Sequence, residues 1–116
     1  VIAFIIDYVN ANKHILSCAY DSIGREEMKQ FFYADLQGVT QSIVDGVCTE
    51  NNLSVDDNFK ELLVSFYTEA LAGMLIDYFK YEQRYDRNDL IRHIIFILKK
   101  SIPNILTAKY NESSKE

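Results

Sequence analysis

The pattern of apolar and polar positions is clearest between Asn58 and Lys80, a stretch with no proline and a single glycine. Its apolar residues recur at intervals of three and four, which is typical of an amphipathic helix. Because apolar pairs repeat every four residues, the apolar stripe advances by about 40° per repeat around the helix. Only a narrow polar strip remains, through Gly73, Asp77 and Lys80. We expect a helix buried on several sides, with one side covered by a partner subunit.

The chain before this helix follows the same period. Residues 1–11 are predicted to form the end of a helix, and Asn12 to cap a short second helix. The stretch 21–24, which ends in Gly24, is predicted to be a break between two helices. A long helix is then predicted from Arg25 to about Asn52.

Later in the chain, two acidic stretches resemble helix starts. Residues 54–57 are predicted to cap the central helix, and residues 86–89 to cap the last long helix. Pro103 is expected to end or kink that last helix, and residues 107–116 to form a flexible tail. No stretch shows the alternation of a β-strand. The predicted fold is all-α, an antiparallel bundle of about five helices.

Composition narrows this picture. At 116 residues, of which 48% are hydrophobic, the chain is expected to fold as one domain. Its net charge of −5 argues against direct binding of a nucleic-acid backbone. Cys18 and Cys48 have no metal-ligand spacing and are interpreted as free, buried thiols of a cytoplasmic protein. The apolar runs are too short to span a membrane, so no membrane partner is expected.

Candidate catalytic chemistry is sparse. His14 and His93 are far apart, and neither has a Glu or His three or four residues away. No zinc spacing, di-iron pattern, nucleophile motif or phosphate-binding glycine loop occurs. We therefore expect no enzyme activity, no metal and no cofactor.

The aromatic side chains are more informative. Several tyrosines and phenylalanines carry large apolar bodies, which either form ordinary core or line a mostly apolar pocket between helices. Thr68, Glu69 and His93 are candidates for the polar groups of such a pocket. Gly73 costs about 1 kcal/mol within a helix relative to alanine. It is either a tolerated defect or a point where a helix or a ligand approaches closely.

Three segments together resemble the C-terminal domain of TetR/AcrR-family transcriptional regulators: Ile6–Lys13 (IDYVNANK), Phe66–Phe79 (FYTEALAGMLIDYF) and Asp86–Leu90 (DRNDL). The resemblance extends from residue 1 to about residue 106. Many relatives carry tryptophan at the position of Tyr78, whereas this chain has no tryptophan.

The resemblance implies a division of labour. In such bacterial-type regulators an N-terminal helix-turn-helix domain binds DNA, while the C-terminal domain binds a small effector and forms a homodimer through its last two helices. The chain begins within a helical pattern, so we expect a fragment that lacks the DNA-binding domain and would contact DNA only through it.

The apolar pattern and the resemblance together assign two sites. The ligand-binding residues are predicted to be Tyr8, Tyr20, Phe32, Phe66, Tyr67, Ala70, Met74 and Tyr78. The dimer interface is predicted to comprise Ala72, Leu75, Ile76, Phe79, His93, Phe96, Ile97 and Lys100. The alternative is a helical protein–protein interaction module that binds a partner helix and no small molecule.

Overall fold

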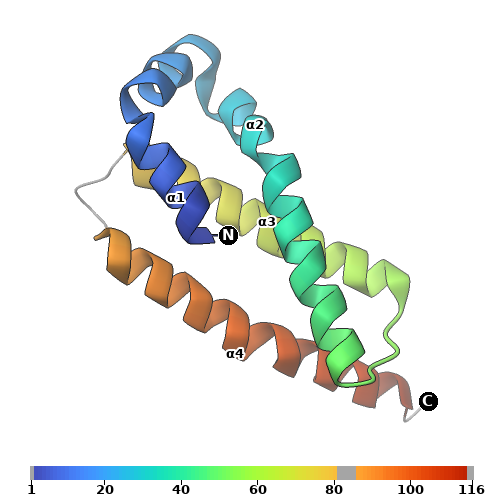
Figure 1. The fold of residues 1–116 in the computed structure, drawn as a ribbon. Helices are drawn as coiled ribbons and strands as arrows, with labels where there is room; N and C mark the ends of the chain where they lie inside the picture. Colours follow the sequence, from blue (N-terminus) through green and yellow to red (C-terminus); the bar gives the residue numbers. More distant parts are fainter. Residues whose placement is uncertain (1, 81–85, 115–116) are drawn as a thin grey trace.

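The computed structural model describes residues 2–80 and 86–114. Within those ranges the chain forms four helices and no strand: α1 (Ile2–Ala11), α2 (Lys13–Glu50), α3 (Asp57–Lys80) and α4 (Arg87–Ser114). The all-α class is confirmed, but the predicted count of about five helices is not matched. Figure 1 shows α2 and α3 crossing, with α4 as a long separate helix that runs toward the C-terminus.

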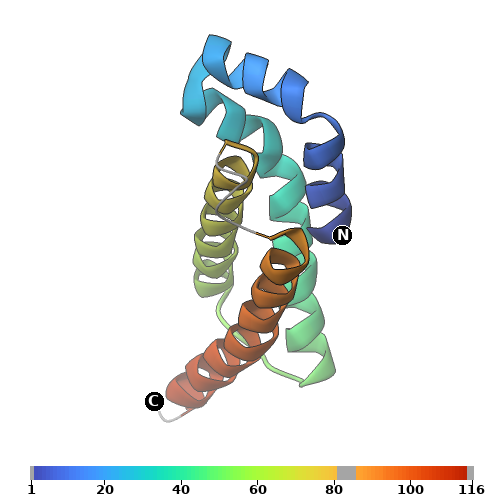
Figure 2. The ribbon, with the colours of Figure 1, turned by 90° about the vertical axis from the view of Figure 1, so that its left-hand side faces the viewer.

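The interruption expected at residues 21–24 is a bend within α2. Gly24 has φ 86° and ψ 173°, which is not helical, yet hydrogen bonding continues on both sides of it. That backbone conformation is essentially confined to glycine, because a Cβ would clash with the neighbouring peptide groups. The two predicted helices are thus one bent element, and the bend folds the N-terminal part of α2 back over α3 (Figure 2).

Two of the predicted helix caps need correction. Asn12 does not cap α2; its side-chain amide donates to the carbonyl oxygen of Tyr8 at the end of α1, at 2.9 Å. At the start of α3, the capping acceptor is Asp56 rather than Ser54: the amide of Phe59 donates to its carboxylate at 3.3 Å. A carboxylate suits this position because it also complements the helix dipole.

The cap predicted for α4 is confirmed, since the amide of Asp89 donates to the carboxylate of Asp86 at 3.1 Å. Pro103, however, does not end the helix, which continues to Ser114. Residues 107–114 of the expected tail are therefore part of α4. Packing explains the continuation, because Leu106, after the proline, is fully buried, and the Lys109 ammonium lies 5.2 Å from the Phe59 ring centroid.

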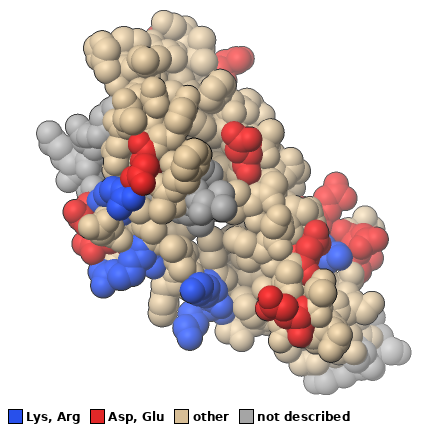
Figure 3. Space-filling view, viewed as in Figure 1, with Lys and Arg blue, Asp and Glu red and all other residues tan. Residues whose placement is uncertain are grey.

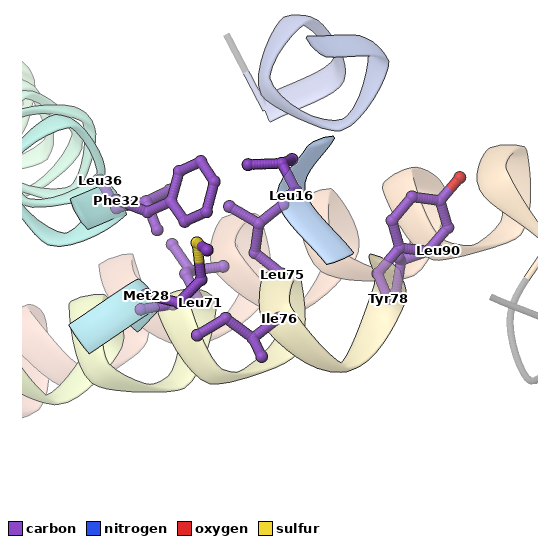
Figure 4. Close-up of a cluster of buried hydrophobic side chains, with 10 residues drawn as sticks. Leu16, Met28, Phe32, Leu36, Leu71, Leu75, Ile76, Tyr78 and Leu90 are labelled. Atoms are coloured by element: carbon purple, nitrogen blue, oxygen red, sulfur yellow. The ribbon is translucent and has the colours of Figure 1, made fainter. Parts of the chain in front are cut away.

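The interior consists of two clusters. The first core cluster joins the N-terminal half of α2 to the end of α3 and the start of α4, through Leu16, Met28, Phe32, Leu36, Leu71, Ala72, Leu75, Ile76, Tyr78 and Leu90. Figure 4 shows these side chains converging, with the Tyr78 hydroxyl pointing away from the others. The second core cluster lies toward the α2–α3 loop and contains Val44, Cys48, Leu63, Val64, Tyr67, Leu98, Ile102 and Leu106.

Polar contacts fasten α2 to α3 beside the first core cluster. Arg25 pairs with Asp77 at 3.5 Å, and Lys29 donates to Glu69 at 2.7 Å. Gly73 lies between these two pairs along α3, and a Cβ built on it would sit 3.6 Å from the Arg25 guanidinium. The polar strip of α3 is therefore the side that meets the basic residues of α2, and at Gly73 the close neighbour is an arginine side chain.

Polar contacts also hold α1 in place. Asp7 pairs with Arg87 at the start of α4, and the Tyr78 hydroxyl of α3 donates to the Asn10 side chain at 2.8 Å. The hydrogen bond from Arg87 lowers the pKa of Asp7 and raises that of Arg87. These two contacts tie α1 to α4 and α3.

The molecule measures 52 × 27 × 19 Å along its principal axes. Since one helix with its side chains is about 10–12 Å across, the thinnest dimension holds two helix layers. Each helix in such a slab has an outward side. No described helix is long and apolar enough to cross a membrane.

Candidate functional site

A groove of about 810 Å³ lies between α2 and α4, and Ala3 of α1 forms part of its wall. Most of its wall is aliphatic. Its lining residues are Ala3, Asp35, Gly38, Val39, Ser42, Ile43, Val47, Ile95, Leu98, Lys99 and Pro103. This volume and this apolar character are within the range of small-ligand sites.

Small side chains on α2 leave the groove open. A Cβ built on Gly38 would meet no atom within 4 Å, and Ser42, one turn later, is also small. Across the groove, the compact ring of Pro103 on α4 does not extend far toward α2. The space between the two helices is therefore left free by side-chain size.

The polar groups of the groove are Asp35, Ser42 and Lys99. Asp35 and Lys99 are exposed, and within the described residues neither forms an ion pair or a side-chain hydrogen bond. Their charges are thus available to a bound molecule. An apolar wall with a few polar groups fixes both the body and the orientation of a ligand.

A second cavity, of about 230 Å³, adjoins the groove at Asp35. It is lined by Phe4, Tyr8, Phe31, Phe32, Asp35 and Leu36. The rings of Phe31 and Phe32 meet edge to face, with centroids 5.2 Å apart. Asp35 is the residue common to the two linings, so its carboxylate borders both aliphatic and aromatic surroundings.

The eight predicted ligand-binding residues do not surround one cavity. Tyr8 and Phe32 line the aromatic cavity. Tyr20 and Met74 pack against the first core cluster.

The other four have different surroundings. Tyr67 and Tyr78 are buried in the core, where their hydroxyls bond Ser101 at 2.6 Å and Asn10. Phe66 and Ala70 are exposed on the outer side of α3. The residues that do line the groove were missed; the useful signal was the pair Gly38 and Ser42, two small residues one turn apart beside the apolar Val39 and Ile43.

The predicted polar groups lie elsewhere. Thr68 is buried and donates to the carbonyl oxygen of Val64 in its own helix, at 2.6 Å. Glu69 accepts from Lys29, which raises the pKa of that lysine. His93 is exposed on α4. None of these three side chains lines the groove.

The predicted dimer interface divides into two parts. His93, Phe96, Ile97 and Lys100 lie on the outer surface of α4, with Phe96 60% and Ile97 55% exposed. Their role remains a proposal. Phe79 lies outside the residues whose side chains are described.

The α3 half of that prediction is wrong in its placement. Ala72, Leu75 and Ile76 are 0%, 6% and 1% exposed and belong to the first core cluster. The bent N-terminal half of α2 covers them. The side of α3 that was expected to meet a partner subunit is therefore covered by the same chain. The apolar residues that α3 exposes are Leu62, at 65%, and Phe66, at 68%, with Ala70 one turn further on.

We use the name α3–α4 face for the exposed residues on the outer sides of these two helices: Leu62, Phe66, Ala70, His93, Phe96, Ile97 and Lys100. The two helices are joined beside it by the hydrogen bond between Tyr67 and Ser101. Phe66 stacks edge to face on Tyr67, with centroids 5.9 Å apart. Ile97 lies one turn before Ser101, so the apolar residues of both helices flank this hydrogen bond.

The charge distribution and the possible metal ligands indicate no further site among the described residues. On the side of the molecule in Figure 3, acidic and basic side chains lie in small separate groups, without a continuous basic patch among the residues drawn there. In the described ranges no three His, Cys, Asp or Glu side chains gather to hold a metal ion. Cys48 is buried, which raises the pKa of its thiol, while Cys18 is exposed, contrary to expectation.

These features describe a helical domain with an apolar groove and with exposed apolar residues on α3 and α4, an arrangement suited to binding. Comparison with known families identifies its class. The TetR-type family of transcriptional regulator C-terminal regions matches residues 1–100. The chain therefore belongs to this family, and its fold agrees with that of a TetR C-terminal domain. No curated protein and no solved structure gives a significant match.

Proposed function

We propose that this chain is the effector-sensing and dimerising part of a TetR-type transcriptional regulator, whose DNA-binding head would lie outside these residues. The family match carries the proposal. The groove and the α3–α4 face supply one surface for each task, and they lie on different sides of α4. A cytoplasmic regulator without enzymatic chemistry is consistent with both.

The α3–α4 face is proposed as the dimer interface. A two-fold dimer buries the same patch on both subunits, so a face built from two neighbouring helices would form a four-helix arrangement with its copy. Exposed Leu62, Phe66 and Ile97 would lose their contact with water there, which is the main driving force for association. His93 and Lys100 would lie at its polar rim.

The groove is proposed as the effector site. Ala3 of α1 forms part of its wall, so a ligand would contact the helix nearest to a head that precedes the chain. A ligand changes the position of α1 only if it binds one arrangement more tightly than another. Such a shift would alter the Asp7–Arg87 ion pair, and ion pairs at the surface contribute little free energy.

The dimer is tested by replacing Phe66 with Glu and measuring the mass by sedimentation. Since Phe66 is exposed, the subunit should fold normally, while a buried charge at the interface should shift the chain to monomer. Phe31→Glu is the matched control, because Phe31 is similarly exposed, at 65%, but lies on α2. A wild-type monomer, or a Phe66→Glu dimer, would contradict the proposal.

The groove is tested with the neutral fluorescent probe N-phenyl-1-naphthylamine. Gly38→Leu should fill the groove and abolish probe binding, whereas Gly46→Leu, at another open position of α2 outside the lining, should not. Equal binding by both variants would show that the probe binds elsewhere.

The exposed row of Leu62 and Phe66, four residues apart, also favours a second candidate. Such a row suits a partner helix of another protein. A chain that is monomeric alone and associates only with a foreign helical peptide, in a manner lost in Phe66→Glu, would establish this interaction module in place of the homodimer.

A further inference from the structure

We propose that the effector is an organic cation with an apolar body, and that Asp35 holds its charged group. The inference rests on the proposed sensing function and gives the chemical class of the molecule sensed. It follows from where one carboxylate lies and from what surrounds it.

Asp35 stands at the junction of the aliphatic groove and the aromatic cavity. No described residue neutralises it. A carboxylate between two apolar cavities loses part of its hydration when a ligand fills them, and this loss is costly unless the ligand supplies an opposite charge. A neutral ligand would leave that cost in place, whereas a cation would remove it.

The aromatic cavity suits the same charge. Phe4, Tyr8 and Phe31 line it and are 74%, 47% and 65% exposed. Aromatic ring faces carry negative electrostatic potential and attract alkylammonium groups within about 6 Å of the ring centroid. Three exposed aromatic side chains beside one carboxylate thus form a partial cage for a substituted ammonium group.

The groove fits the remainder of such a molecule. From Asp35 it continues along Val39, Ile43 and Val47 on α2 and faces Ile95, Leu98 and Pro103 on α4. An alkyl or aryl body would lie along these side chains and gain about 25 cal/mol for each Å² of apolar surface removed from water.

Lys99 is the competing charge in the groove, and an anionic amphiphile would place its head group there. Lys99 does not line the aromatic cavity, so an anionic head would leave the exposed rings and Asp35 unused. The net charge of −5 also draws cations toward the protein and repels anions. Both observations favour the cation.

The test compares three probes of equal alkyl length by isothermal titration calorimetry near neutral pH, each below its micelle-forming concentration. They are decyltrimethylammonium, the net-neutral decyldimethylamine N-oxide and the anionic decanoate. The cation should bind most tightly. Asp35→Asn should weaken its binding by about five- to tenfold, as expected for a partly buried charge pair, and leave the N-oxide unchanged.

Glu61→Gln provides the matched control, because it removes one exposed acid on α3 and should change no affinity. Phe31→Leu should weaken binding of the cation by about threefold and leave binding of decanoate unchanged. Equal cation affinity in Asp35→Asn, or tightest binding by decanoate, would overturn the cation assignment while leaving the effector site intact. If no probe binds the wild-type chain, the effector function itself fails.

Discussion

The two core clusters are built from similar residues but are held together differently. In the second core cluster Val44, Ile102 and Leu106 are completely buried, and the α2–α3 loop covers its end with Leu53 and Val55. The first core cluster is equally apolar inside, and the close ion pairs Lys29–Glu69 and Asp7–Arg87 fasten its edges. Beside the second core cluster the ion pair between α2 and α3, Lys60–Asp45, is longer, at 4.0 Å, and the Tyr67–Ser101 hydrogen bond joins α3 to α4. In the part of the chain that the structure describes, the bend at Gly24 and the short helix α1 both lie at the end that holds the first core cluster.

The difference indicates a division of mechanical roles. Apolar burial involves no charged groups and is not screened by salt as ion pairs are, so the second core cluster should keep α2, α3 and α4 together as pH and ionic strength vary moderately. Ion pairs at the protein surface are weak and screened by salt. The groove touches both ends: Ala3 and Asp35 line it toward the first core cluster, while Ile43, Val47 and Leu98 belong to or pack against the second.

The largest expected effect is in the second core cluster. Ile102→Ala should lower the free energy of unfolding by about 2–5 kcal/mol, because it creates a cavity at a fully buried position. Ile15→Ala, the same change at a 66% exposed position of α2, should cost far less. Urea denaturation followed by circular dichroism measures both, and similar costs would contradict the described burial.

The next effect concerns the bend. Gly24→Ala should cost about 1–3 kcal/mol, because an L-residue is strained at this φ and ψ. Hydrogen exchange should show the loss in α1 and the N-terminal half of α2, with the amides around Val44 still protected. Uniform loss of protection would show that the two clusters unfold as one unit.

A smaller effect of opposite sign is expected at Gly73. Gly73→Ala should raise the melting temperature, with a gain of about 0.5–1 kcal/mol, because helix propensity improves. The added methyl would be at ordinary contact distance, 3.6 Å, from the Arg25 guanidinium. A loss of stability would mean that Arg25 cannot adjust and that its pair with Asp77 depends on glycine.

The smallest effect is the pH response of α1. Because Arg87 lowers the pKa of Asp7, the Asp7–Arg87 contact is complete above the unfolded-state pKa of about 3.9. It weakens as pH falls through the lower folded-state value. Amide resonances of α1 should therefore shift below about pH 4 in the wild type and not in Asp7→Asn. Identical titrations would show that this contact does not position α1.

The sequence predicted the helical class, the approximate bounds of the central helix, the interruption before Arg25 and the acidic start of α4. Those features depend on local pattern and local hydrogen bonding. The orientation of the central helix could not be obtained in this way. Phe66 and Ile76 are both apolar and belong to overlapping stripes, yet one is 68% exposed and the other 1%. Only the bend at Gly24, which brings the N-terminal half of α2 over Ile76, decides between them.

The groove was missed for a related reason. Hydrophobic patterns report where side chains are large and apolar, whereas the groove exists because Gly38 and Ser42 are small. Pro103 was predicted to end or kink α4 because of its local effect on the backbone. Leu106, beyond it, is fully buried, so packing favours continuation of the helix. In both cases a tertiary contact determined the outcome.

The hydrogen bond between Tyr67 and Ser101 has a directional consequence. Ser101 has one hydroxyl proton and donates it to the carbonyl oxygen of Ile97 at 2.6 Å. Tyr67 must therefore donate to Ser101, and the two bonds form a relay from the α3 side chain to the α4 backbone. Axial sliding of α3 past α4 would break it. The relay thus locks the two helices in register, and a second subunit would meet a surface already set to a fixed spacing.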